Sequence, residues 1–101
     1  FYQYLKAEPN FDSVVAADYL MANAALEALS ARGYRVPQEI AVVGFGDGAE
    51  AEAVGLTTVA ADIVGLGRQG TRQLLGQIDG LQIQGLTMMS THLVVRRTSC
   101  P

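Results

Sequence analysis

Cysteine and histidine each occur once in this chain of 101 residues, and tryptophan is absent. The single cysteine, Cys100, excludes an internal disulfide. That fits a reducing compartment, although a periplasmic protein without disulfides would have the same composition. The single histidine, His92, lies in an apolar stretch, which indicates a structural role rather than catalysis. No second histidine or cysteine completes a zinc site or a catalytic dyad. We therefore predict no metal, no cofactor and no enzymatic activity.

Positive charge is also scarce. Seven lysines and arginines stand against ten aspartates and glutamates, for a formal net charge of -3. The largest basic cluster is the pair Arg96-Arg97. Direct binding of nucleic acid by this chain is therefore disfavoured.

Long apolar runs are missing too. No segment has transmembrane length, and no signal peptide is recognisable. The chain begins at Phe1 rather than at a methionine. We therefore expect it to be a portion of a longer protein, whose targeting segments this portion cannot reveal.

Hydrophobic residues are abundant, at 50% of the chain, which is enough for a packed core. Their pattern predicts a strand at residues 11–17, a helix from Asp18 to Arg32 and a buried strand at residues 40–43. Asp18 suits the helix N-cap, and Gly33 suits the position just past the end of the helix. This order, over about 30 residues, is typical of a right-handed βαβ unit in a parallel sheet.

The second half of the chain predicts one more strand, one more helix and a final extended segment. Gly67 and Gly70 interrupt that second helix, which indicates that its face touches a neighbouring backbone. We expect Met88-Met89 in the core and the tail, residues 97–101, exposed. The predicted bounds are a terminal helix at 1–8, a loop or helical turn at 48–55, a strand at 56–60, a helix at 62–80, a loop at 81–86 and an extended segment at 87–96.

Two acidic side chains follow the two strands of the βαβ unit. Asp18 and Tyr19 lie where the first strand meets the helix, and Asp47 follows the second strand. The carboxyl ends of neighbouring parallel strands share one edge, where open α/β sheets bind ligands. Two acids there could accept hydrogen bonds from a sugar or polyol. Alternatively, Asp18 is only a helix cap, and Asp47 only a turn former beside Gly46.

The glycines after the second strand allow another interpretation. Gly44-Phe45-Gly46 has the start of a dinucleotide-binding fingerprint, but the third glycine is missing and no helix clearly begins there. Nucleotide binding is therefore disfavoured.

Taken in order, these pieces resemble the C-terminal portion of the effector-binding domain of LacI-type transcriptional regulators. The resemblance covers nearly the whole chain. It is carried by residues 11–18 (FDSVVAAD) leading into Met21-Ala22, residues 32–37 (RGYRVP), residues 40–45 (IAVVGF), residues 56–59 (LTTV), Gly67-Arg68, Leu74-Leu75 and residues 93–96 (LVVR).

The resemblance implies an α/β fold of the periplasmic-binding-protein-like type I class, present as an incomplete C-terminal portion. Residues 1–55 would belong to the C-terminal lobe of a two-lobed domain. Residues 56–86 would cross between the lobes and pack a helix on an N-terminal lobe. Residues 87–101 would return through the last strand and the tail. The effector would bind between the lobes, and operator DNA would be read by a helix-turn-helix outside this chain.

The resemblance also implies site residues, with two departures. The family usually has Asn-Asp where this chain has Asp18-Tyr19, and an acid where this chain has Gly46. The implied ligand-binding residues are Asp18, Tyr19, Phe45, Gly46 and Asp47. The implied homodimer interface contains Asn23, Glu27 and Val54.

The function so implied is sugar sensing in a cytoplasmic, dimeric repressor. Effector binding would favour one arrangement of the lobes through its differential affinity. Two alternatives remain: a periplasmic sugar-binding protein of a transport system, and a sensory module of a signalling kinase.

Overall fold

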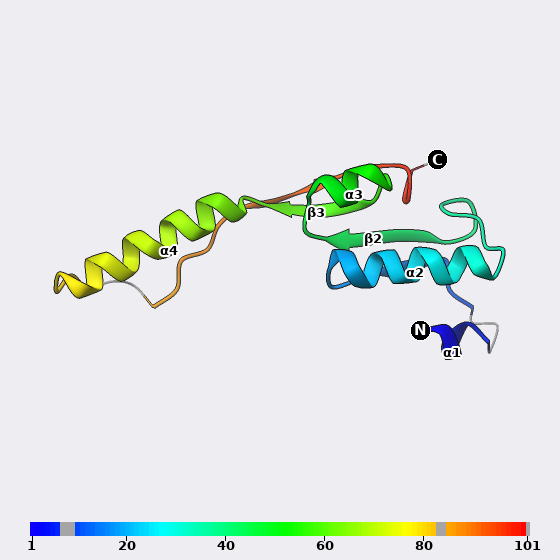
Figure 1. Ribbon diagram of the computed structural model, residues 1–101, viewed down its shortest axis with the longest axis horizontal. Coiled ribbons are helices and arrows are strands. Elements are labelled where there is room, and N and C mark those ends of the chain that lie inside the picture. The colour runs from blue at the N-terminus through cyan, green and yellow to red at the C-terminus, as the bar shows by residue number, and fades with distance from the viewer. Residues whose placement is uncertain (7–9, 83–84, 101) are drawn as a thin grey trace. The chain divides into compact units, whose positions relative to one another are not determined.

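The computed structural model describes residues 1–6, 10–82 and 85–100, without the side chain of Tyr2. The chain divides into two compact units (Figure 1). The first contains Phe1–Ala60 and His92–Pro101, and the second contains Ala61–Thr91. The boundaries fall within the last two strands, so each unit is described by itself below.

A four-stranded sheet organises the first unit. Its strands are adjacent in chain order: β1 (Ser13–Val15), β2 (Ala41–Phe45), β3 (Thr57–Ala61) and β4 (Thr91–Val94). β1 and β2 are parallel, with Val15 opposite Val43, and β2 and β3 are parallel, with Gly44 opposite Thr58. The predicted parallel α/β fold is thus confirmed. The first strand is shorter than predicted, and Val15 is 82% exposed rather than buried.

The βαβ unit is closed by α2 (Tyr19–Ala31), which packs along β2 (Figure 1). Small side chains on one side of the helix allow a close approach, because Ala22, Ala25 and Ala28 are all buried. The helix begins and ends as predicted. Asp18 caps it, and Gly33 takes a φ of 79° just past its end.

The core lies between this helix and the central strand. Leu29, Val42 and Leu56 are fully buried. Gly44 is required by this packing, because a Cβ there would lie 2.9 Å from Cδ2 of Leu56 and 3.2 Å from Cβ of Ala22. Two short helices complete the unit: α1 (Tyr2–Leu5), which buries Leu5, and α3 (Ala49–Ala53), which buries Ala51. The segment predicted as a loop or helical turn is therefore helical.

The C-terminal tail is part of this core, which corrects the expectation that it is exposed. Thr98 is buried and bonds to both central strands. Its hydroxyl donates to the Val42 carbonyl oxygen (2.7 Å) and accepts from the Thr57 backbone N–H (2.9 Å). Val42 N–H in turn donates to the Thr98 carbonyl oxygen (2.8 Å). Arg97 and Cys100 are exposed, as expected.

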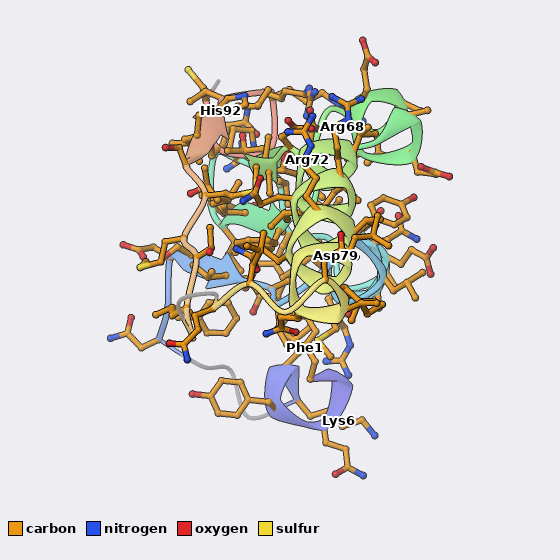
Figure 2. The ribbon with its side chains drawn as sticks, turned by 90° about the vertical axis from the view of Figure 1, so that its left-hand side faces the viewer. Phe1, Lys6, Arg68, Arg72, Asp79 and His92 are labelled. Carbon is orange, nitrogen blue, oxygen red and sulfur yellow. The ribbon has the colours of Figure 1, made fainter. Side chains whose placement is uncertain are left out.

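The second unit is built on α4 (Ile63–Ile78), capped by Asp62, whose Oδ1 accepts the Gly65 N–H at 2.8 Å. No residue of α4 is buried, and Arg68 and Arg72 project from it one turn apart (Figure 2). A Cβ on Gly67 or Gly70 would find no atom within 4 Å outside the helix's own backbone. The neighbouring backbone expected there is thus not among the described residues. Met88, expected in the core, is 85% exposed.

The predicted loop at 81–86 lies partly outside the described residues, as does the end of the predicted helix at 1–8. In the part of the chain that is described, no helix is long and apolar enough to cross a membrane.

Candidate functional site

Two chain segments meet at the carboxyl edge of the sheet. Residues 16–19 follow β1, and residues 46–48 follow β2. The parallel register places the ends of these strands side by side. Asp18 and Asp47 therefore belong to the same edge, as the order of the elements predicts.

Asp18 is the helix cap that the sequence indicates. Its Oδ1 accepts the Met21 N–H at 2.8 Å, and the residue is exposed. A carboxylate offers roughly four acceptor positions, so one capping bond leaves capacity for a ligand hydroxyl. Tyr19 is half-buried and packs against the core, which limits the ring surface that it can offer to a sugar.

The turn after β2 is anchored by its backbone. Phe45 ends the strand and is 46% exposed. Gly46 has a φ of 94°, a region that other residues rarely adopt, and its N–H donates to the Val59 carbonyl oxygen at 3.0 Å. No atom lies within 4 Å of the position of a Cβ on Gly46. Glycine is therefore needed here for its backbone conformation rather than for lack of space.

Asp47 is held by an arginine from the far end of the chain. Nη1 of Arg96 lies 2.6 Å from Oδ1 of Asp47, and Nη2 lies 3.2 Å from Oδ2. The Thr58 hydroxyl donates to the same Oδ1 at 3.0 Å. The hydrogen bond from Arg96 is the main cause that lowers the pKa of Asp47, and the same bond raises the pKa of Arg96. Asp47 is thus more than a turn former.

Arg96 is the residue that sequence reasoning missed at this edge. In the sequence it stands out only as half of a basic pair and as part of the family-like ending. No sequence signal could pair it with an acid 49 positions earlier. The partnership exists because β4 lies beside β3 in the sheet. Arg96 follows β4, bonds to Leu56 and Thr57 where β3 begins, and reaches Asp47 from there.

The predicted dimer residues lie together elsewhere on the first unit. Asn23, Glu27 and Val54 all line an open groove of about 610 Å³. The Asn23 amide donates to Oε1 of Glu27 at 2.8 Å, so the two side chains form one polar rim. The other lining residues are apolar or aromatic, such as Leu26, Tyr34 and Val36, or polar, namely Ser30, Arg97 and Thr98.

His92, expected to be structural, is exposed on β4 rather than packed in the core. Its charge contributes slightly to the lowered pKa of Asp47. Among the described residues, no group of three or more histidine, cysteine or acidic side chains could hold a metal ion.

Comparison with known proteins accounts for this arrangement. A family profile described as "Periplasmic binding protein-like domain" matches residues 2–99. The chain belongs to this family. HTH-type transcriptional regulator CelR of Thermobifida fusca is 38% identical over 97 residues, covering 93% of this chain and 28% of CelR. The similar solved chains are LacI family transcriptional regulators, which confirms the resemblance seen in the sequence.

Two solved structures are especially informative. The lac repressor dimer bound to operator and the anti-inducer ONPF has a TM-score of 0.91 at 29% identity, over 97% of this chain and 35% of that one. The CelR–cellobiose complex has a TM-score of 0.85 at 38% identity, over 94% of this chain and 30% of that one. The chain therefore spans about a third of these proteins. They are transcriptional regulators rather than enzymes.

Proposed function

We propose that this chain is the effector-sensing part of a sugar-responsive, LacI-type repressor. One observation carries the proposal: Asp18 and the turn at residues 45–48 share the carboxyl edge of a parallel sheet. Relatives of this chain include a regulator solved with cellobiose. We assign the effector to the sugar class on that basis, with a disaccharide as the first candidate.

The division into two units supports a two-lobed architecture. The unit boundary falls at Ala60–Ala61 and again at Thr91–His92. These positions lie inside residues 56–86 and 87–101, the segments expected to cross between the lobes and to return. On this proposal α4 packs on an N-terminal lobe, which would cover apolar side chains that are exposed in this chain, such as Ile63, Val64 and Ile78.

The mechanism is one of binding rather than catalysis. A sugar between the lobes stabilises whichever arrangement it contacts better, and only that difference in affinity shifts the equilibrium. The crossing segments transmit the shift to a helix-turn-helix that reads operator DNA. The net charge of -3 agrees with DNA binding outside this portion. A regulator that binds chromosomal operators would act in the cytoplasm.

We further propose that the protein is a homodimer through the groove that Asn23, Glu27 and Val54 line. The groove is lined by both apolar and polar side chains, as protein interfaces commonly are. In the intact protein, Val54→Arg should convert dimers to monomers in analytical ultracentrifugation. Gln38→Arg, at an exposed position that does not line the groove, is the matched control. A dimer that survives Val54→Arg would place the interface elsewhere.

The sugar proposal is tested by titrating the intact protein with cellobiose and a panel of mono- and disaccharides in a calorimeter. We expect at least one sugar to bind. Asp18→Asn should weaken its binding about tenfold, because a hydrogen bond to a charged group contributes more than one to a neutral group. Absence of binding to every sugar at millimolar concentration would exclude the sugar class.

A further inference from the structure

Asp47 and Arg96 form a bidentate ion pair beside the candidate site. Both carboxylate oxygens face the guanidinium, at 2.6 and 3.2 Å, and Oδ1 also receives the Thr58 hydroxyl. The side chains of Arg96 and Asp47 are only 19% and 26% exposed. By contrast, the exposed pair Arg35–Glu39 has one contact between the charged groups, at 3.1 Å, and its side chains are 72% and 42% exposed. Two-pronged contacts of this kind fix direction as well as distance.

Arg96 is also held by hydrogen bonds that do not involve Asp47. Its backbone N–H donates to the Thr57 hydroxyl oxygen (2.8 Å), and that hydroxyl lies 3.0 Å from the Arg96 carbonyl oxygen, to which it donates. Its Nη1 also donates to the Leu56 carbonyl oxygen at 2.9 Å. Bonds to β3 thus hold Arg96 in place independently of its contact with Asp47.

The backbone of the turn at residues 45–48 places Asp47 within reach of Arg96. Gly46 takes its positive φ, and its N–H is tied to Val59 on β3. Asp47 then reaches Thr58 on the same strand. The turn is thus held to β3 at two successive residues and to the end of β4 through Arg96.

We propose that Asp47 is a positioning residue and not the acid that contacts the effector. Arg96 is its anchor, and the pair holds the turn at residues 45–48 in the conformation that receives the ligand. Asp18 is then the acid that accepts ligand hydroxyls at this edge. This division of roles rests on the proposed sugar-sensing function, whereas the anchoring of the turn does not.

The anchoring is tested without any sugar, by hydrogen exchange in the intact protein. Arg96→Met removes the guanidinium and keeps the aliphatic stem, and Asp47→Asn removes the charge and keeps the shape. Both should speed amide exchange at residues 45–48 by about threefold or more, because the turn opens more often without its anchor. Arg35→Met removes an arginine that is paired elsewhere, with Glu39, and should leave this segment unchanged. Unchanged exchange in Asp47→Asn would overturn the proposal even if Arg96→Met failed to fold.

The division of roles is tested by calorimetric titration with cellobiose, or with whichever sugar of the panel binds. Asp47→Asn and Arg96→Met should each weaken binding, and the double variant should lose no more than Arg96→Met alone, because both act through the same turn. If Asp47→Asn weakened binding further in the Arg96→Met background, Asp47 would touch the ligand and the division of roles would be wrong. If the unaltered protein bound no sugar, the proposed function would fail, and the exchange experiment would still decide whether Arg96 anchors the turn.

Discussion

At the scale of single residues, Asp18 caps a helix, and we have also proposed it as a ligand contact. Its carboxylate caps α2 through the Met21 N–H. Asp18→Ala should lower the free energy of unfolding by about 1 kcal/mol, because the Met21 N–H at the start of the helix loses its acceptor. Asp18→Asn should cost much less, since asparagine is an equally good N-cap. Urea denaturation of the intact protein measures both variants. Equal losses would mean that the charge, rather than the cap, supports the fold.

Asp47 predicts a dependence of stability on pH. Hydrogen bonds from Arg96, and then from Thr58, lower its pKa below the ordinary value of 3.8. A group with a lowered folded-state pKa stabilises the fold above its unfolded pKa, and this contribution is lost as the pH falls through the folded pKa. The melting temperatures of the intact protein and of Asp47→Asn should therefore differ near neutral pH, and the difference should begin to shrink as the pH falls below 3.8. A difference that stayed constant down to pH 3 would contradict the ionised pair.

At the scale of elements, local signals predicted more than distant ones. The cap Asp18, the alanines of α2 and the end at Gly33 lie within one helix, and that helix was placed correctly. The burial of Thr98 was not foreseen, because its partners Val42 and Thr57 are 56 and 41 positions away. The edge of the site could be predicted from strand order. Its anchor, Arg96, required the sheet itself.

The docked tail yields a prediction of its own. Thr98→Val removes the hydroxyl that bridges the Val42 carbonyl oxygen and the Thr57 N–H, and leaves the Thr57 donor buried and unpaired. We expect a loss of about 1–3 kcal/mol in the free energy of unfolding. Thr91→Val, at an exposed position on β4, is the matched control and should change stability little. Chemical denaturation of the intact protein measures both variants. Equal stability of the two would mean that the tail is not docked on the central strands.

Replacing a glycine of α4 should have opposite effects in an isolated peptide and in the intact protein. In a peptide of residues 62–80, Gly67→Ala should increase helicity by circular dichroism, because alanine favours the helix by about 1 kcal/mol. In the intact protein the same change should lower the melting temperature if the proposed N-terminal lobe packs on this face, since the added methyl group would meet it. Gln77→Ala, at an exposed position, is the control in both settings. Stabilisation in both settings would mean that no backbone packs against Gly67.

At the scale of the whole molecule, this chain is about a third of the regulators that it resembles, and its exposed surface has the character of an interior. Ile63, Val64 and Ile78 are 66%, 71% and 71% exposed, all on one helix. Soluble monomers rarely leave such a set uncovered. We proposed above that an N-terminal lobe covers these side chains. Without that lobe, the chain should be less stable or less soluble.

We therefore predict that the 101 residues, produced alone, aggregate or lack a cooperative unfolding transition. Replacing two of the exposed apolar side chains in the double variant Val64→Glu/Ile78→Glu should reduce light scattering by the isolated chain, because charge opposes association through that face. In the intact protein the same double variant should lower the melting temperature, because it would place two charges in the proposed contact between α4 and the N-terminal lobe. Gln77→Glu adds charge at a polar position of the same helix and should have little effect in either setting. A cooperative melt from a monomeric isolated chain would show that the face of α4 needs no partner.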